Sequence, residues 1–162
     1  MHITSYNEMQ SFVRRYLDVN KDYKILDVGS GDVNGTYRKL FLQWNYTGMD
    51  ITKGKNVDVV MKDQYTFPFE GETFDVVISG QVLEHVKMFW ITAMEIERVL
   101  KPGGLICLIV PGASGVHRYP VDCWRMLPDG MDALCEWMEV TRLESYMKEY
   151  KGYADTVLIA RK

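Results

Sequence analysis

The segment from Lys24 to Gly31 limits what this chain can fold into. The apolar run Lys24–Val28 ends directly in Gly29, Ser30 and Gly31. A short apolar run followed by a glycine turn is typical of a buried strand that leads into a loop. Ligands of open α/β sheets bind beside the carboxyl ends of such strands, where glycine lets the backbone approach them closely. The segment therefore predicts a first strand with a ligand-binding turn or, on the simpler interpretation, a tight strand-to-helix turn alone.

The rest of the chain alternates strand-like runs with segments of helical spacing. We expect strands at 46–50, 57–61, 74–79, 105–110, 138–143 and 156–160, and helices at 36–44, 88–100 and 129–137. Strands that alternate with helices favour a parallel sheet with right-handed crossovers. The last two runs have no helix between them, so we expect an antiparallel edge pair joined by a reversal at 148–152. The predicted fold class is α/β, a doubly wound sheet in one domain of residues 1–162, with residues 1–20 as an N-terminal helix or partial lid.

Composition and charge exclude several classes of protein. The 162 residues carry 19 Lys and Arg against 22 Asp and Glu, a net charge of −3, which argues against a sequence-independent grip on nucleic acid. The apolar run 105–110 is far shorter than the roughly 20 residues that cross a bilayer. Residues 1–15 show no apolar stretch of signal-peptide length. The cysteines at 107, 123 and 135 form no C-x-x-C pair, which favours reduced thiols and a cytoplasmic location.

Two acidic residues distinguish between nucleotide-like ligands. Asp27 lies at the end of the first strand, where a carboxylate would repel a pyrophosphate but attract an ammonium group. Asp50 ends the second strand, about twenty residues after the turn, and its paired oxygens suit the two hydroxyls of a ribose. S-adenosylmethionine has an ammonium group, a ribose and no phosphate. The competing interpretation is a nicotinamide dehydrogenase, against which Asp27 argues.

Short segments in a fixed order carry a resemblance to a known family. They are ILDVGSG (25–31), Asp50, Asp63 followed by Phe67-Pro68-Phe69, FDVVIS (74–79), VLEHV (82–86), LKPGG (100–104) and LICLIVPG (105–112). Over residues 23–161 the chain resembles the class I S-adenosylmethionine-dependent methyltransferases, in particular the small type 11 group. The resemblance implies a Rossmann-like sheet of seven strands in the order 3-2-1-4-5-7-6. It also implies S-adenosylmethionine as cofactor and S-adenosylhomocysteine as product.

The same resemblance assigns the cofactor-binding residues. They are Asp27, Gly29, Ser30 and Gly31 for the methionine half, Asp50 for the ribose, Ile51 beside the adenine, Asp63 and the Gln64 backbone at the adenine amino group, and Gly80 and Gln81 near the sulfonium. One position departs from the family pattern, because Val33 stands where a third glycine is common. We therefore expect a turn that is longer or differently shaped. The alternative roles are a local turn cap for Asp63 and a solvated strand end for Asp50.

The segment Gln81–His85 bears on metal binding. Some family members that methylate hydroxyl groups bind a divalent metal through E-x-x-E-H, and this chain has Gln81 at the first position. An amide there lowers the charge and the expected metal affinity. We therefore expect no metal, with Glu84 and His85 in a local hydrogen-bonded turn that shapes the pocket.

Methyl transfer from a sulfonium depends on the alignment of nucleophile and methyl group and on the exclusion of water. A general base is needed only when the acceptor must lose a proton. His85, His117 and Asp122 are the candidates for that role. A chain that binds the cofactor without catalysis, as a partner or sensor, is the competing function.

Residues 117–125 are the expected acceptor site. They resemble the H-x-Y-P-x-D-x-W-R stretch of type 11 members encoded near carbohydrate-assembly genes, which implies a sugar-type or other small-molecule acceptor. We expect Tyr119 and Trp124 to stack on a ring of the acceptor, and Arg125 to hold a carboxylate or phosphate. In the alternative, Trp124 fixes the loop to the core and Arg125 pairs with an acidic residue.

Overall fold

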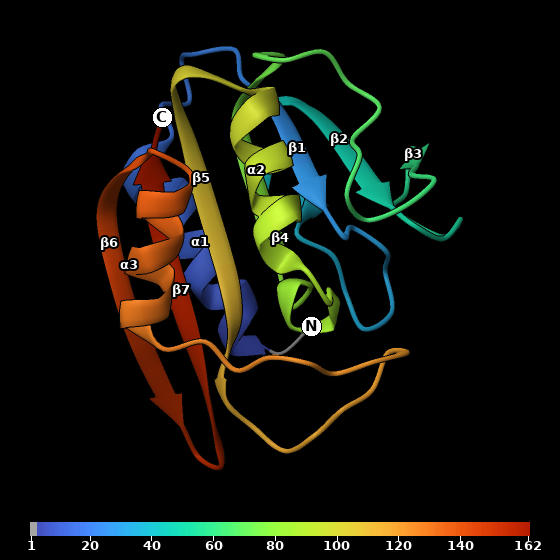
Figure 1. Cartoon of the computed structure of the whole chain (residues 1–162). Helices are drawn as coiled ribbons and strands as arrows, with labels where there is room; N and C mark the ends of the chain where they lie inside the picture. Colours follow the sequence, from blue (N-terminus) through green and yellow to red (C-terminus); the bar gives the residue numbers. More distant parts are fainter. Residues whose placement is uncertain (1–2) are drawn as a thin grey trace.

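The computed structural model describes residues 3–162 and shows a central sheet with helices on both faces (Figure 1). The elements in chain order are α1 (Ile3–Tyr16), β1 (Lys24–Val28), η1 (Arg38–Leu40), β2 (Asn45–Asp50), β3 (Val59–Val60), β4 (Phe74–Gly80), η2 (Leu83–His85), α2 (Phe89–Val99), β5 (Leu100–Ala113), α3 (Pro128–Trp137), β6 (Thr141–Tyr150) and β7 (Tyr153–Arg161). Residues 1 and 2, part of the expected N-terminal segment, lie outside the described residues. None of the helices within residues 3–162 has the length and apolar character needed to cross a membrane.

The strands of residues 3–162 form one sheet in the order β3-β2-β1-β4-β5-β7-β6. The pairs from β3 to β5 are parallel, whereas β7 runs antiparallel to both β5 and β6. The strand order and the antiparallel C-terminal edge confirm the expected fold class. In a parallel sheet of this kind β1, β2 and β4 all end at the same edge, which brings the residues after them together.

The side chains of successive residues in each central strand pack into two hydrophobic cores, one on each face of the sheet. On one face, α1 contributes Met9 and Phe12 to a core that includes Ile25 of β1. On the other face, α2 and α3 cover a core that includes Leu26. Burial on both faces explains why β1, β4 and β5 read as continuous apolar runs.

The helix expected at 36–44 is wrong, because only the short η1 forms there. The connection from Val28 to Asn45 must first accommodate the glycine turn, which leaves little length for a helix. Tyr37, Phe41 and Trp44 are nonetheless buried, in the same core as α1. Helical spacing of apolar residues therefore marked an irregular segment that packs its large side chains against the sheet.

Several strand boundaries also differ from expectation, and two of them have a clear structural cause: β3 is shorter than expected, whereas β5, β6 and β7 extend further. β6 begins at Thr141 rather than residue 138, because residues 138–140 continue from α3 in a turn in which the Met138 amide donates to the Leu134 carbonyl at 3.0 Å. β5 begins at Leu100 and contains the Pro102-Gly103-Gly104 segment, where the register to β4 shifts. Residues 114–127 form neither helix nor strand, as expected, and cross the edge of the sheet at which β1 and β4 end (Figure 1).

Candidate active site

A cavity of about 650 Å³ lies at the carboxyl ends of β1, β2 and β4. Its walls come from residues 27–31, 33–37, 50–52, 80–82, 85–86 and 117–120, with Met61, Gln64 and Thr92. The volume is in the range of sites that enclose a small organic ligand. The cavity therefore joins the glycine turn to the loop that follows β5.

The glycine turn is required by close packing on both sides. Gly29 has φ +79°, and a Cβ there would lie 2.2 Å from Cγ2 of Val82. The Gly31 amide donates to Oδ2 of Asp50 at 3.1 Å, and a Cβ on Gly31 would lie 2.9 Å from that oxygen. After the turn, residues 33–37 continue along the cavity wall instead of entering a helix. The glycine turn thus leads into an irregular segment that carries Val33.

Asp27 is buried at the bottom of the cavity, with 2% of its surface exposed. The phenol of Tyr46 donates a hydrogen bond to its Oδ2 atom, and the guanidinium of Arg38 lies over the Tyr46 ring at 4.4 Å. Burial raises the pKa of Asp27 to about 7, although the Tyr46 hydrogen bond and Arg38 oppose the rise. The carboxyl group is thus poised to become fully charged when a cation binds beside it.

Asp50 holds the opposite wall of the cavity. Besides the Gly31 contact, its Oδ1 atom accepts hydrogen bonds from the Thr52 amide at 3.0 Å and the Thr52 hydroxyl at 3.1 Å. Ile51 is 39% exposed and lines the cavity, as does Gln64. Asp63 does not line it, because its carboxylate caps a local turn by accepting from the Tyr65 amide at 2.7 Å. Asp63 thus makes the contact of the local turn cap, the alternative considered for it.

The end of β4 forms the wall nearest α1. A Cβ on Gly80 would lie 2.2 Å from the Tyr37 hydroxyl, which shares a hydrogen bond with Ser5 of α1. Gln81 has φ +61°, and its side-chain amide donates to Oδ1 of Asp155 at 3.0 Å. Both Gly80 and Gln81 line the cavity. No residue of α1 is among those that line the cavity.

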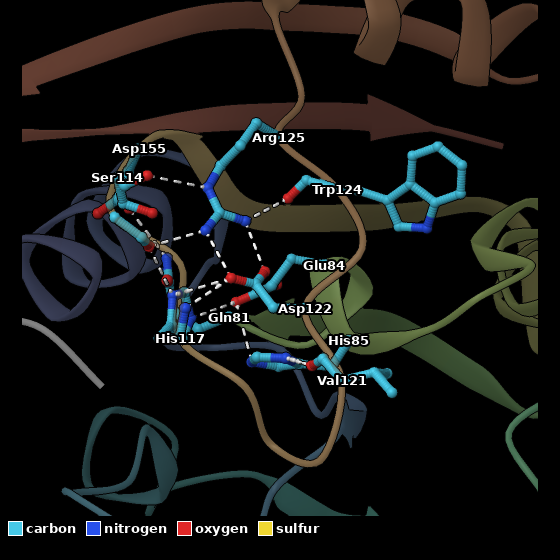
Figure 2. A network of polar contacts seen from close by, with 11 residues as sticks. Gln81, Glu84, His85, Ser114, His117, Val121, Asp122, Trp124, Arg125 and Asp155 are labelled. Atoms are coloured by element: carbon cyan, nitrogen blue, oxygen red, sulfur yellow. Dashed lines mark hydrogen bonds and ion pairs between the residues drawn. The ribbon is translucent and has the colours of Figure 1, made fainter.

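Glu84, His85 and His117 lie together where η2 meets the loop after β5 (Figure 2). His85 and His117 line the cavity, whereas Glu84 lies behind them with 1% of its surface exposed. Nε2 of His85 lies 3.5 Å from Oε1 of Glu84, and Nε2 of His117 lies 3.7 Å from the same oxygen. Burial raises the pKa of Glu84 to about 8, and burial lowers the pKa of His85.

The turn expected around Glu84 and His85 forms through the backbone only. The His85 amide donates to the Val82 carbonyl at 2.9 Å. The Glu84 carboxylate, in contrast, accepts no hydrogen bond from any residue between 3 and 162. The side chain is therefore not part of the hydrogen-bonded turn that the sequence suggested.

Three of the residues expected to act on the acceptor have structural partners instead. The Arg125 guanidinium donates to both carboxylate oxygens of Asp122, at 2.6 and 2.7 Å (Figure 2). The Trp124 indole donates to the Val86 carbonyl at 2.9 Å, and its ring packs against the core beneath α2 and α3. Asp122, Trp124 and Arg125 are not among the residues that line the cavity, and their contacts are those expected if they fix the loop. Tyr119 does line it and is 64% exposed.

Comparison with known proteins places this arrangement in a family. The sequence profile of the type 11 methyltransferase domain matches residues 26–108, which is half of the chain. The chain belongs to the type 11 methyltransferase family. The family segment contains the glycine turn, Asp50 and the end of β4, so the shared sequence coincides with the first three walls of the cavity.

The relatives of this methyltransferase-family chain differ from it in length and sequence. A demethylmenaquinone methyltransferase of Staphylococcus aureus is 33% identical over 112 residues, covering 59% of this chain and 46% of the relative. The chain thus spans about half the length of the curated relatives that it matches. Among solved structures, a Burkholderia thailandensis 1,6-didemethyltoxoflavin N1-methyltransferase with bound S-adenosylhomocysteine superposes with a TM-score of 0.78 at 16% identity, over 98% of this chain and 78% of that one. A Bacillus halodurans protein superposes with a TM-score of 0.74 at 14% identity, over 96% and 99%.

Several cavity residues of this methyltransferase-family chain escaped the sequence analysis. Thr36 and Tyr37 line the cavity because the segment after the turn is irregular, whereas helical spacing suggested that this segment only packed on the core. Val82, the residue before η2, and Thr92 of α2 also line it. Gln81 lines the cavity with a positive φ, a conformation that a glutamine in the sequence does not predict.

Proposed function

We propose that this chain binds S-adenosylmethionine in the cavity and transfers its methyl group to a small-molecule acceptor. One observation carries the proposal: Asp27 and Asp50 line the same cavity on either side of the Gly29–Gly31 turn. A buried carboxyl group suits an ammonium, and a partly exposed carboxylate suits a pair of ribose hydroxyls. A nucleotide that places a phosphate at this turn fits less well than S-adenosylmethionine does, because the carboxyl group of Asp27 would repel the phosphate.

The glycine turn also fits a ligand-binding loop. A Cβ at position 29 or 31 would collide with Val82 or Asp50, so both residues must be glycine. Both glycines line the cavity, where their backbone has no side chain to keep a ligand away. In this proposal Asp27 and the turn hold the methionine half, Asp50 holds the ribose, and Ile51 with Gln64 contacts the adenine.

When bound, S-adenosylmethionine supplies an electrophilic methyl group on a sulfonium. The chain then has to orient the acceptor, exclude water and take up a proton where the acceptor carries one. Nδ1 of His85 lies 2.6 Å from the Val121 carbonyl, which can only accept, so the ring proton is on Nδ1 and Nε2 is left to take a proton. Burial lowers the pKa of His85, which favours the neutral ring. As long as no metal occupies Nε2, His85 is therefore the candidate general base that the geometry favours.

Residues 117–120 form the acceptor side of the proposed site. His117, Arg118 and the exposed Tyr119 bring two rings and a cation to the cavity. The relatives named above act on demethylmenaquinone and on 1,6-didemethyltoxoflavin, both small molecules. These relatives support a small-molecule acceptor, and the loop adds the positive charge and aromatic surface that a sugar-type or ring-containing acceptor would use.

Calorimetry and a labelled-methyl assay test the two parts of this proposal separately. S-adenosylhomocysteine should bind with one-to-one stoichiometry and raise the melting temperature, because a ligand that binds only the folded state stabilises it. Absence of binding at millimolar concentration would refute the cofactor assignment. Binding without transfer to any member of a broad acceptor panel would instead favour a non-catalytic binding module.

A further inference from the structure

The Glu84 carboxyl group is an unexplained polar group in the interior of the protein. The residue is 1% exposed, and neither oxygen accepts a hydrogen bond from residues 3–162. An unpartnered buried carboxylate is costly, and native structures normally satisfy such groups with a hydrogen bond, an ion or water. Its Oε1 atom faces two imidazole nitrogens instead, those of His85 and His117.

Both imidazoles are held so that Nε2 is directed at that oxygen. Nδ1 of His85 is hydrogen-bonded to the Val121 carbonyl at 2.6 Å. Nδ1 of His117 lies 3.4 Å from the Gly115 carbonyl and 3.7 Å from Oδ2 of Asp122, which also accepts from the His117 amide at 2.6 Å. Metal-binding histidines characteristically use their second nitrogen in this way, which fixes the ring orientation. Arg125 holds Asp122 in turn, so the loop that delivers His117 is itself fixed (Figure 2).

The spacing of the three groups matches a metal coordination sphere. One ligand atom from each of Glu84, His85 and His117 can be chosen so that all lie within 4.8 Å of one another. Ligands of a tetrahedral Zn²⁺ site, at bond lengths of about 2.0–2.1 Å, lie about 3.3 Å apart. The carboxylate-to-imidazole distances of 3.5 and 3.7 Å are close to that value. We propose that Glu84, His85 and His117 bind a divalent transition metal ion of the Zn²⁺ class.

This ligand set differs from the E-x-x-E-H arrangement considered for the sequence. The amide of Gln81 is occupied by Asp155 at 3.0 Å and takes no part. The third ligand comes instead from His117, on the loop after β5. Two imidazoles and one carboxylate favour Zn²⁺, Fe²⁺ or Co²⁺ over the oxygen-preferring Mg²⁺ and Ca²⁺.

The proposed metal has an open side toward the cavity. Glu84 lies behind the wall, whereas His85 and His117 line it, so coordination positions not used by protein face the ligand space. Three protein ligands with an open position are typical of metal sites that bind substrate or water. Resting on the proposed function, the metal would coordinate an oxygen of the methyl acceptor and so select hydroxyl- or carboxyl-bearing compounds.

Titration of the metal-free chain with Zn²⁺ and with Co²⁺ tests the site without any assay of activity. All variants carry Cys123→Ser, because the exposed Cys123 thiol could bind either ion. One equivalent of each ion should bind, and bound Co²⁺ should give the visible absorption of a four- or five-coordinate site. Glu84→Gln and His117→Gln should each weaken binding by at least about tenfold. Glu136→Gln, an exposed carboxylate remote from the cluster, is the matched control and should bind as the parent does.

Melting temperatures separate a lost ligand from a lost fold. Without metal, Glu84→Gln should melt no lower than the parent, because the amide replaces a buried carboxyl group that accepts no hydrogen bond within residues 3–162 and is costly to ionise there. With Zn²⁺, the parent should gain stability and the variant should not. Unchanged metal affinity in Glu84→Gln and His117→Gln, or no stoichiometric binding in the parent, would overturn the proposal. S-adenosylhomocysteine binding, measured on the same samples, reports independently on the proposed cofactor site.

Discussion

Arg125 holds both carboxylate oxygens of Asp122, with Nη1 2.6 Å from Oδ1 and Nη2 2.7 Å from Oδ2. The pairing keeps the pKa of Asp122 well below its ordinary value. The same guanidinium donates to the Gly115 carbonyl at 2.8 Å, so it links the two arms of the loop after β5. A segment without regular structure is thereby given one conformation at the mouth of the cavity.

Arg125→Ala should therefore destabilise the protein. The change leaves the Asp122 side chain, which is 1% exposed, without its guanidinium partner. Loss of a charge-assisted partner costs about 1–3 kcal/mol. Urea unfolding measures the loss, and Tyr119→Ala is the comparison, since that exposed side chain lines the cavity and should alter turnover with little change in stability. Equal stability of parent and Arg125→Ala would contradict the role given to the pair.

Asp50→Ala should weaken the binding of S-adenosylhomocysteine by about 1–3 kcal/mol, because it removes the charged acceptors proposed for the ribose hydroxyls. Asp63→Ala is the matched control. Asp63 caps a turn outside the cavity, so its removal should leave the dissociation constant unchanged. Calorimetry on both variants gives the comparison, and an equal loss of affinity in the two would show that the effect is general.

Asp27 should make the stability of the ligand-free protein depend on pH. Its pKa rises from 3.8 to about 7 on folding, so the folded state binds more protons than the unfolded state between those values. Stability should then fall as the pH rises from about 4 to about 7 and level off above that. The groups that face this carboxyl are Tyr46, Arg38, Asp50 and Tyr37.

Asp27→Asn separates this contribution from that of other groups. The amide oxygen can still accept from Tyr46, so the variant should match the parent below about pH 4, where Asp27 is protonated in both states, and be more stable at pH 7 and above. The same variant should bind S-adenosylhomocysteine less tightly, because the ligand ammonium loses its carboxylate. Denaturant unfolding at several pH values measures the first effect. Parallel stability curves for parent and variant would refute the raised pKa.

Gly29→Ala should destabilise the protein more than Gly103→Ala does. Both glycines have positive φ, +79° and +78°, and a Cβ in that conformation costs about 1–2 kcal/mol. At Gly29 the Cβ would also lie 2.2 Å from Val82, whereas at Gly103 no atom lies within 4 Å. The difference between the two variants measures the close approach of the turn to η2. Thermal unfolding should rank them in that order, and the reverse ranking would be incompatible with the packing described.

The sequence was sufficient for the sheet and for one half of the site. Buried parallel strands such as 74–79 carry their signal locally, and Asp27 and Asp50 end their strands, so the topology brings them together. No comparable local pattern in the sequence predicts the direction in which a side chain on a loop points. Trp124 and Arg125 share a short polar and aromatic segment with Tyr119, and only the fold decides that Tyr119 faces the cavity while the other two face inward.

Contacts between residues far apart in the sequence were the second feature that could not be predicted. Glu84 and His117 come from segments far apart in the sequence, and neither residue predicts the other. Their proximity follows from the path of the loop, which the Cys123 amide ties to the Glu84 carbonyl at 2.7 Å. The helix expected at 36–44 failed for a related reason, because helical spacing records which residues are buried and leaves open the backbone that buries them.

The first turn of α1 supports two cavity residues from outside. Ser5 holds the hydroxyl of Tyr37, and Thr4 donates to Asp155 at 3.1 Å, the same residue that receives the Gln81 amide. A purification tag or fusion partner that disturbs this turn would shift Tyr37 and Gln81 together. Ligand affinity would then change although every residue in contact with the ligand was intact, so binding measurements on tagged and untagged protein need not agree.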